Sequence, residues 1–205
     1  NNLAETMQRG IALHQKGQLE EAAHIYEQVL LNNPQHFEAL KLLGTLAYQS
    51  GKIQLAIELI SRSIAINPSY ADSHYNLGIA LKKHGELEKA VRSYQRALVI
   101  NPDYAEATYN LGIALQEQGK LEEAIQSYQK ALVINPDYAK AHNNLGGALK
   151  EQGKLKEAIE SYQRALVLNP EFDIAYYNLG TVLREQGKQE EAIQSYQRAL
   201  VLNPE

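Results

Sequence analysis

Residues 105–138 read AEATYNLGIALQEQGKLEEAIQSYQKALVINPDY, and a stretch of the same pattern recurs every 34 residues along the chain. The period is visible in the prolines alone, which are Pro34, Pro68, Pro102, Pro136, Pro170 and Pro204. Two series of glycines, which begin at Gly10 and Gly17, keep the same spacing, and only Gly147 lies outside them. A fixed period of this length indicates an architecture of stacked structural repeats.

Within the quoted stretch the sequence predicts two helices joined by a turn. Asp103 is expected to cap the first helix, which should begin near Ala105. Gly119 is expected to end this helix in the left-handed conformation. The second helix should begin near Leu121 and end at Asn135, because a residue before proline avoids the helical region.

The second helix carries an apolar stripe at three- and four-residue spacing. Its members are Leu121, Ala124, Ile125, Tyr128, Ala131 and Leu132. One helix pair cannot bury this stripe alone, so each pair is expected to stack on its neighbours. Gly112 and Ala124 have a glycine and an alanine as counterparts in every unit, and their small size should let the paired helices approach closely. The tyrosines at the Tyr128 position are expected to be core residues; they are Tyr26, Tyr94, Tyr128, Tyr162 and Tyr196.

These recurring positions resemble the tetratricopeptide signature over essentially the whole chain. In the quoted stretch they are Asn110, Leu111, Gly112, Gly119, Ala124, Tyr128, Ala131 and Pro136. The resemblance implies an all-α fold, a right-handed superhelical solenoid of six helix-turn-helix repeats that forms a single domain, 1–205. The repeats would span 3–36, 37–70, 71–104, 105–138, 139–172 and 173–205. The phrase Asn-Leu-Gly-Ile-Ala-Leu with Glu-Gln-Gly-Lys is most similar to repeats of O-linked N-acetylglucosamine transferases and of bacterial tetratricopeptide proteins.

The composition argues against several classes of protein. The formal net charge of −4 lacks the basic excess of a surface that neutralises phosphates, so neither nucleic acid nor an anionic membrane is an expected partner. The chain has no cysteine, which excludes disulfides and is compatible with the cytoplasm, where we expect the protein. No apolar run approaches the roughly 20 residues of a membrane span, and the first residues do not read as a signal peptide. The missing initiator Met suggests a fragment.

No motif predicts catalysis, a metal site or a cofactor. The pair Gly119 and Lys120 lacks the glycine-rich loop of a phosphate site. The six histidines lack the spacing of a metal-binding helix. Adjacent carboxylates such as Glu122 and Glu123 point about 100° apart on a helix and cannot flank one substrate bond. We therefore expect a protein that is not an enzyme and that needs neither a metal nor a cofactor.

One helical face does carry a functional signal, because an asparagine recurs at one position of the first helix in four repeats. Asparagine has a low propensity for the middle of a helix, so helix formation alone does not explain why it recurs there. The strips that contain it are Asp72, Asn76, Ile79 and Lys83; Glu106, Asn110, Ile113 and Glu117; Lys140, Asn144, Gly147 and Glu151; and Ile174, Asn178, Thr181 and Glu185. The family resemblance implies that these strips face the concave side of the superhelix. We expect their asparagines and charged residues to contact a bound peptide.

Two explanations of the asparagines stay open at this point. In the first, they grip the backbone of an extended ligand. In the second, they have no ligand role and either bond between neighbouring first helices or merely persist through duplication of the repeat. The carboxylates of the strips outnumber the lysines, which predicts a groove that prefers neutral or mildly basic segments.

The predicted function is a scaffold that binds a protein or peptide in the concave groove of the solenoid. The alternative is the substrate-recruiting region of a larger glycosyltransferase-like enzyme whose catalytic domain is absent from this sequence. A clamp for C-terminal carboxylates is not expected, because Thr45 and Glu106 stand where that family pattern has Asn and Lys.

The C-terminal repeat is expected to lack a polar closing helix, which solenoids usually need for solubility. The residues expected to be partly uncovered there are Ile193, Tyr196, Ala199 and Leu200. This predicts either further repeats in the native protein or end-to-end self-association through the uncapped repeat.

Overall fold

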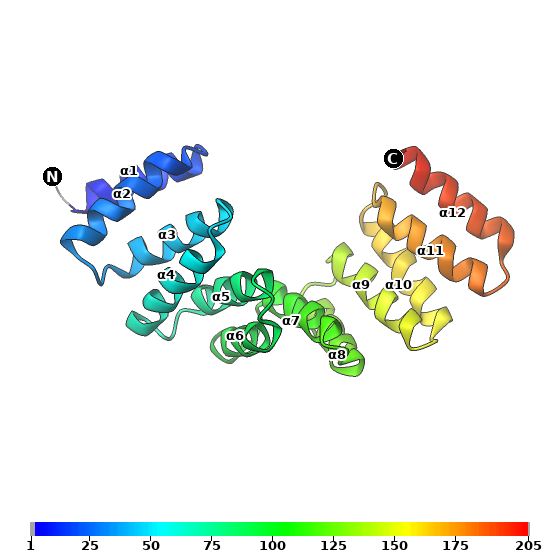
Figure 1. Ribbon diagram of the computed structural model, residues 1–205. Helices are drawn as coiled ribbons and strands as arrows, with labels where there is room; N and C mark the ends of the chain where they lie inside the picture. Colours follow the sequence, from blue (N-terminus) through cyan, green and yellow to red (C-terminus); the bar gives the residue numbers. More distant parts are fainter. Residues whose placement is uncertain (1–2, 205) are drawn as a thin grey trace. The chain divides into compact units, whose positions relative to one another are not determined.

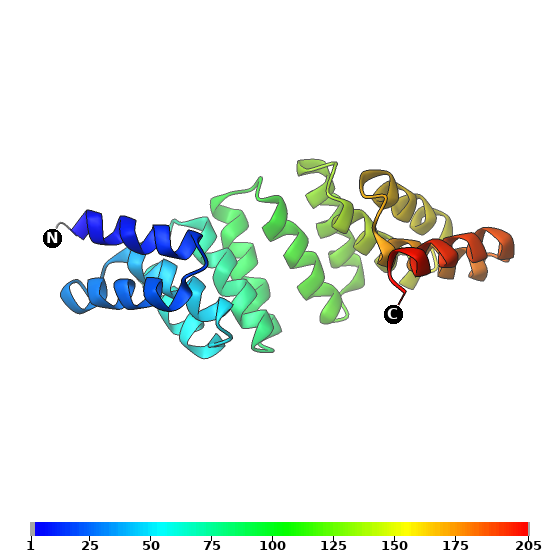
Figure 2. The same ribbon diagram turned by 90° about the horizontal axis from the view of Figure 1, so that it is seen from above.

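The computed structural model describes residues 3–204, which form twelve α-helices and no strand (Figures 1 and 2). In chain order, α1 to α12 span Leu3–Gln15, Leu19–Asn32, Phe37–Gln49, Ile53–Ile66, Ala71–Lys83, Leu87–Ile100, Ala105–Glu117, Leu121–Ile134, Ala139–Glu151, Leu155–Leu168, Asp173–Glu185 and Gln189–Leu202. Each repeat therefore consists of an odd-numbered A helix and an even-numbered B helix. The prediction of an all-α solenoid built from six helix-turn-helix repeats is confirmed.

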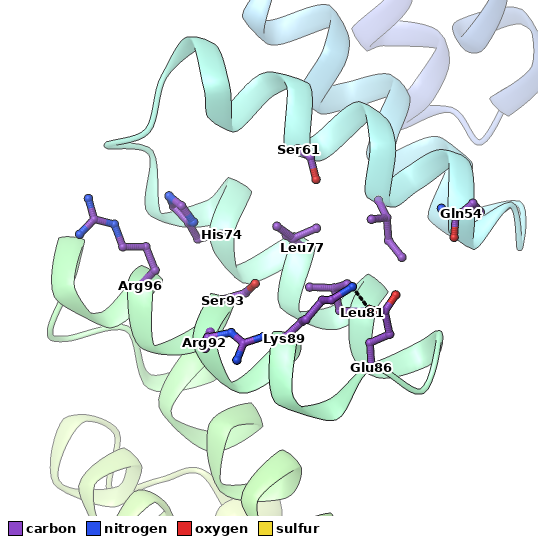
Figure 3. A pocket seen from close by; sticks show the side chains of 11 residues that line it. Gln54, Ser61, His74, Leu77, Leu81, Glu86, Lys89, Arg92, Ser93 and Arg96 are labelled. Carbon is purple, nitrogen blue, oxygen red and sulfur yellow. Dashed lines mark ion pairs between the residues drawn. The ribbon is translucent and has the colours of Figure 1, made fainter.

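The chain divides into two compact units at Pro102 and Asp103. Unit 1 contains α1 to α6, and unit 2 contains α7 to α12. Within each unit the A and B helices of a repeat pack together, and the B helix also packs on the next A helix. In unit 1, for example, Leu77 and Leu81 of α5 lie between α4 and α6 (Figure 3). In unit 1 one apolar core thus runs through the stacked repeats, from Met7 of α1 to Ala80 of α5.

Local backbone chemistry fixes the helix ends. Gly119 has a φ of 76°, in the left-handed region that favours glycine, and it separates α7 from α8. Helix α8 ends at Ile134, and Asn135, which precedes a proline, is extended with φ −130° and ψ 91°. These predicted ends are confirmed.

The predicted helix cap at Asp103 is wrong. Helix α7 begins at Ala105 as expected, but the residue in the cap position is Tyr104, whose side chain makes no capping hydrogen bond. Asp103 lies one residue too early. In the next repeat the turn is stabilised from its other end, since Asn135 Oδ1 accepts a hydrogen bond of 3.2 Å from the backbone N–H of Asp137. The asparagine before the proline, rather than the aspartate after it, holds this turn.

The close approach of paired helices depends on small residues, as predicted. A Cβ atom added at Gly112 would lie only 2.7 Å from the Tyr128 ring, and Ala124 on the facing helix is fully buried. The tyrosine ring therefore packs directly against the glycine, where no larger residue fits. The equivalent tyrosines are almost completely buried in four repeats, at Tyr26, Tyr94, Tyr128 and Tyr162. Tyr196 in the last repeat is only half-buried.

Candidate functional site

The strips with the recurring asparagine lie on A helices in both units. Asn110, Asn144 and Asn178 lie on α7, α9 and α11, which are neighbours within unit 2. The fourth asparagine, Asn76, lies on α5 of unit 1 together with the exposed Asp72 and Lys83. The structure thus brings three of the four strips together, and the candidate site is built from them.

The asparagine side chains connect neighbouring A helices. Asn144 Nδ2 donates a hydrogen bond of 3.1 Å to the phenol oxygen of Tyr109 on α7. Asn178 Nδ2 donates one of 3.1 Å to Asn143 Oδ1 on α9. Asn110 Nδ2 donates to the backbone carbonyl of Glu106 in its own helix, at 2.9 Å. The second explanation, bonding between neighbouring A helices, therefore applies to Asn144 and Asn178.

A pocket of about 390 Å³ opens on this face of unit 2. Its lining residues are Ile113, Gln116, Glu117, Tyr128, Asn143, Asn144, Gly147, Glu151 and Asn178. We call it the Gly147 pocket, because a Cβ atom at Gly147 would meet nothing closer than the Tyr162 phenol oxygen at 3.6 Å.

Two small side chains create the Gly147 pocket. Gly147 replaces the Ile or Thr of the other strips, and Asn143 stands where the adjacent repeats of unit 2 have Tyr109 and Tyr177. Sequence reasoning selected Gly147 as part of a strip but missed Asn143, Gln116 and Tyr128. The break in the tyrosine series at Asn143 is the signal that could have found it.

The charge in the Gly147 pocket is negative. Glu117 and Glu151 are its charged lining residues, and no lining residue is basic. Gln116 links the two sides of the pocket, since its Nε2 donates to Glu151 Oε1 at 2.8 Å and its Oε1 accepts from the Tyr128 phenol at 2.9 Å. Burial, followed by smaller effects that include both carboxylates, raises the pKa of Tyr128 well above its usual value. The phenol therefore stays protonated and acts as a hydrogen-bond donor.

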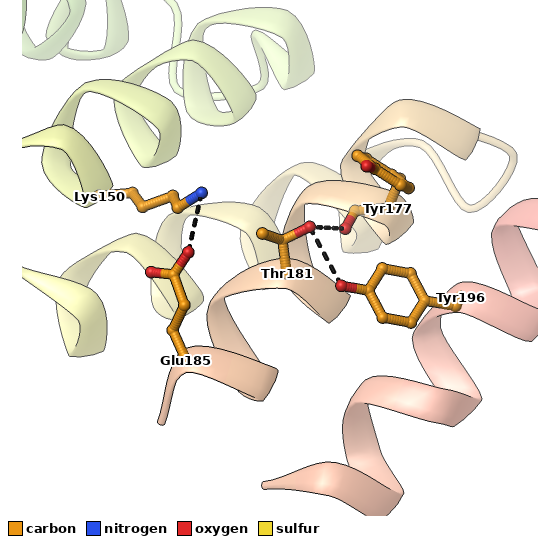
Figure 4. A network of polar contacts seen from close by, with 5 residues as sticks. All are labelled: Lys150, Tyr177, Thr181, Glu185 and Tyr196. Atoms are coloured by element: carbon orange, nitrogen blue, oxygen red, sulfur yellow. Dashed lines mark hydrogen bonds and ion pairs between the residues drawn. The ribbon is translucent and has the colours of Figure 1, made fainter. Parts of the chain in front are cut away.

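On α11, the polar side chains Thr181 and Glu185 of the strip already have partners within the chain (Figure 4). Thr181 Oγ1 donates to the Tyr177 carbonyl at 3.0 Å and accepts from the Tyr196 phenol at 3.2 Å. Glu185 forms an ion pair of 3.1 Å with Lys150. The charge of Glu185 is thus partly neutralised, while Glu106 and Lys140 of the other strips are exposed.

The last repeat presents an open apolar face, as predicted. Ile193 and Leu200 are 54% and 61% exposed, and Tyr196 and Ala199 are half-buried. A pocket of about 460 Å³ lies on this face, and its lining residues are Asp173, Ile174, Tyr177, Tyr196, Ala199, Leu200 and Asn203. We call this surface the terminal face. In the preceding repeat, α11 packs on the equivalent surface.

Residues 3–204 contain no group of three or more His, Asp or Glu side chains placed to hold a metal ion. Among the helices of the described chain, none is both long enough and apolar enough to cross a bilayer.

Family models match most of the chain. A tetratricopeptide repeat model matches residues 7–71 and 143–205, a second tetratricopeptide repeat model matches residues 59–92, and a TPR repeat model matches residues 81–119 and 114–153. No curated protein matches the chain in sequence.

Solved structures of repeat proteins are similar to the chain over most of its length. A MamA protein is 29% identical, with a TM-score of 0.75, and the match covers 82% of this chain and 92% of that one. YrrB, described as a TPR protein with an unusual peptide-binding site, is 19% identical, with a TM-score of 0.73 and coverages of 89% and 94%. PilF of Pseudomonas aeruginosa is 18% identical, with a TM-score of 0.86 and coverages of 98% and 92%.

Proposed function

The chain belongs to the tetratricopeptide repeat family, and from this premise we propose that it is a scaffold that binds a partner protein through an extended peptide segment. The segment lies along the A helices of unit 2 and inserts one side chain into the Gly147 pocket. Repeat proteins present extended surfaces of this kind to their partners. The net charge of −4 favours protein over nucleic acid as the partner.

The Gly147 pocket is the observation that carries the proposal. Its volume of about 390 Å³ is large enough for a peptide side chain, and its polar groups come from three A helices in succession. The absent side chain at Gly147 and the shorter one at Asn143 leave this space open, while the buried Tyr162 and Ala148 keep the packing around it. The Gly147 pocket is thus an open space on an otherwise packed helical face, and a side chain of the bound peptide could fill it.

The asparagines can still serve a ligand. A primary amide has two N–H donors and two acceptor lone pairs. The Asn144 amide donates one N–H to Tyr109 and accepts a hydrogen bond of 3.2 Å from Asn143 Nδ2, so one N–H and one lone pair lie outside these two bonds. A peptide backbone that offers one N–H and one C=O per residue can pair with the remaining groups. Pairing of this kind is independent of the ligand sequence, so specificity would come from the pocket.

The carboxylates of Glu117 and Glu151 predict what the pocket accepts. A lysine or arginine side chain would place its cation near both carboxylates, whereas an acidic side chain would be repelled. The groove should thus prefer neutral or mildly basic segments, with a basic residue at the pocket.

Replacement of Gly147 tests the proposal with a matched pair of variants. Peptides of about ten residues would be selected from a displayed random library on the parent chain, labelled with fluorescein and titrated by anisotropy. Gly147→Ile introduces the residue found at Ile79 and Ile113, so the fold should tolerate it while the pocket is filled. We expect roughly tenfold weaker binding, whereas Gly147→Ala, the control, should bind within about twofold of the parent. Equal affinity of parent and Gly147→Ile would refute insertion into the pocket.

We further propose that the terminal face binds the A-helix end of a second copy. An A helix already covers the equivalent surface inside the chain, where α11 packs on α10. The exposed Ile174, Tyr177 and Leu200 would be buried in the same way. Multi-angle light scattering of the 205-residue chain should show a mass that rises with concentration, and Leu200→Glu should keep it monomeric. A strict monomer at high concentration would count against this second proposal.

The alternative role, recruitment of a substrate to a glycosyltransferase-like catalytic domain, would use the same groove. Transferase activity from this chain alone would contradict our proposal that the chain itself is not an enzyme.

A further inference from the structure

Unit 1 contains a pocket of about 500 Å³ on a different stripe of α5 from Asn76 (Figure 3). Its lining residues are Gln54, Ile57, Ser61, His74, Leu77, Leu81, Glu86, Lys89, Arg92, Ser93 and Arg96. We call it the basic pocket. It lies where α4 and α6, both B helices, pack on the same A helix, α5.

The basic pocket has an apolar floor. Ile57, Leu77 and Leu81 come from α4 and α5, and Leu81 is only 5% exposed. Figure 3 shows Leu77 and Leu81 at the centre of the pocket, with the charged side chains of α6 along one edge. An aliphatic side chain placed on this floor would gain hydrophobic contact without disturbing the packing of α5.

The rim contributed by α6 is positively charged. Within the described chain no carboxylate lies within ion-pair distance of Arg92 or Arg96. Lys89 pairs with Glu86, and this contact is the main reason why the pKa of the Glu86 carboxyl is lowered. The lining thus carries three cationic side chains against one carboxylate.

The hydroxyl of Ser93 adds a polar group to the basic pocket. Ser127, Ser161 and Ser195, its counterparts in later repeats, each donate a 2.9 Å bond to the carbonyl four residues earlier. Within residues 3–204, Ser93 makes no such bond. Its hydroxyl is therefore available to donate to a ligand carboxylate.

This charge is specific to the third repeat. The residues at the positions of Lys89, Arg92 and Arg96 are Glu21, His24 and Gln28; Leu55, Glu58 and Arg62; Glu123, Gln126 and Lys130; Glu157, Glu160 and Arg164; and Glu191, Gln194 and Arg198. No other repeat places more than one Lys or Arg at the three positions. If these side chains were needed for helix packing, we would expect cations at the same three positions in every repeat. Packing therefore does not explain why the third repeat alone has three.

We propose that the basic pocket binds an acidic peptide segment of a partner protein, with an aliphatic side chain on the floor of Ile57, Leu77 and Leu81 and carboxylates at Lys89, Arg92 and Arg96. The charge of the rim selects the acidic ligand, and the apolar floor selects a peptide over a small anion. This surface lies on unit 1 and is independent of the Gly147 pocket on unit 2. The chain would thus hold two segments of opposite charge at separate surfaces.

The test uses a fluorescein-labelled peptide of about ten residues in which Asp and Glu alternate with Leu. We expect saturable binding to the parent chain that weakens as salt is raised. Arg92→Gln with Arg96→Gln should weaken it about tenfold, because two charge pairs are lost. Glutamine already occupies these positions at Gln126 and Gln28, so the variant should fold, and circular dichroism would verify this.

Two controls isolate the pocket. Arg164→Gln with Arg198→Gln makes the same change of charge at the two counterparts of Arg96 in the last two repeats, and this variant should bind as the parent does. A peptide with Asn and Gln in place of Asp and Glu should bind the parent at least about tenfold more weakly, a result that needs no variant. Equal loss in both arginine pairs, equal affinity for the neutral peptide, or no binding of the acidic peptide would overturn the proposal. Binding of the parent to phosphatidylserine vesicles but not to the peptide would overturn it in favour of a membrane surface.

Discussion

Asn144 Nδ2 lies 3.1 Å from the phenol oxygen of Tyr109, so a side chain of the candidate groove also joins two successive A helices. The equivalent amide of Asn178 reaches Asn143 on the helix before it, again at 3.1 Å. A residue at this position can thus align the helices and contact a ligand at once. The two effects can be separated, because the partner Tyr109 does not line the Gly147 pocket.

Substitutions at Asn144 and Tyr109 should affect binding and stability differently. Asn110→Ala with Asn144→Ala should weaken binding of a library-selected peptide about five- to a hundredfold, since each lost amide contact costs roughly 0.5–1.5 kcal/mol. Tyr109→Phe removes the phenol oxygen but keeps both amides, so it should lower the free energy of unfolding by a similar amount and leave affinity within about threefold. Urea denaturation and anisotropy measure the two quantities. Equal loss of affinity in both variants would assign the asparagines to helix alignment alone.

The adjacent glycines Gly146 and Gly147 should respond in opposite ways to alanine. A Cβ atom at Gly146 would lie 2.8 Å from the buried Tyr162 ring, so Gly146→Ala should destabilise the chain by about 1–3 kcal/mol. At Gly147 the nearest atom would be 3.6 Å away, and alanine favours the helix by roughly 0.5–1 kcal/mol. Thermal unfolding should show a lower Tm for the first variant and an equal or higher Tm for the second. The reverse order would mean that the helix pair does not pack as described.

Removal of the buried phenol oxygens should distinguish Tyr26 from Tyr128. Tyr26 Oη is buried and has no hydrogen-bond partner among the described residues, so Tyr26→Phe should leave stability unchanged or raise it by about 1 kcal/mol. Tyr128 Oη donates to Gln116 at 2.9 Å, so Tyr128→Phe should cost roughly 0.5–1.5 kcal/mol. Chemical denaturation of the two single variants gives the comparison. A larger cost at Tyr26 would show that its phenol is satisfied.

Stability should fall in alkaline solution. Burial, with smaller contributions from Glu151 and Glu185, raises the pKa of Tyr162 from 10 to about 12. Between these values the unfolded chain has lost the proton and the folded chain still holds it, so the free energy of unfolding decreases as pH rises from about 10 to 12. The contribution is fully present below pH 10. Tyr162→Phe should show a shallower decrease in urea denaturation, and an unchanged pH dependence would exclude this source.

The sequence predicted the repeats and their helices because local chemistry sets them. Gly119 requires a positive φ, and Asn135 cannot continue a helix into a proline, so the ends of α7 and α8 follow from neighbours in the chain. The misplaced cap at Asp103 shows the limit of this reasoning, since a cap depends on where the turn closes. An error of one residue there leaves the architecture unchanged.

The details of the site could not be predicted in the same way. The bond between Asn144 and Tyr109 joins residues 35 apart, and the Gly147 pocket depends on the small residues Gly147 and Asn143, whose neighbours across the pocket lie on other helices. The charge of the basic pocket depends on Lys89 and Arg92, which a search for recurring residues passes over because no other repeat has a Lys or Arg at either position. Departures from the repeat, rather than the repeat itself, mark both pockets.

Chemical-shift mapping tests the central claim, peptide binding at the Gly147 pocket, most directly. An isotope-labelled parent chain would be titrated with the library-selected peptide and followed by two-dimensional nitrogen–proton spectra. The account predicts that the largest changes fall on the backbone N–H of Gly147 and on the side-chain amides of Asn110, Asn144 and Asn178. Changes confined to the B helices α8, α10 and α12, or no change at Gly147 under saturating peptide, would contradict it.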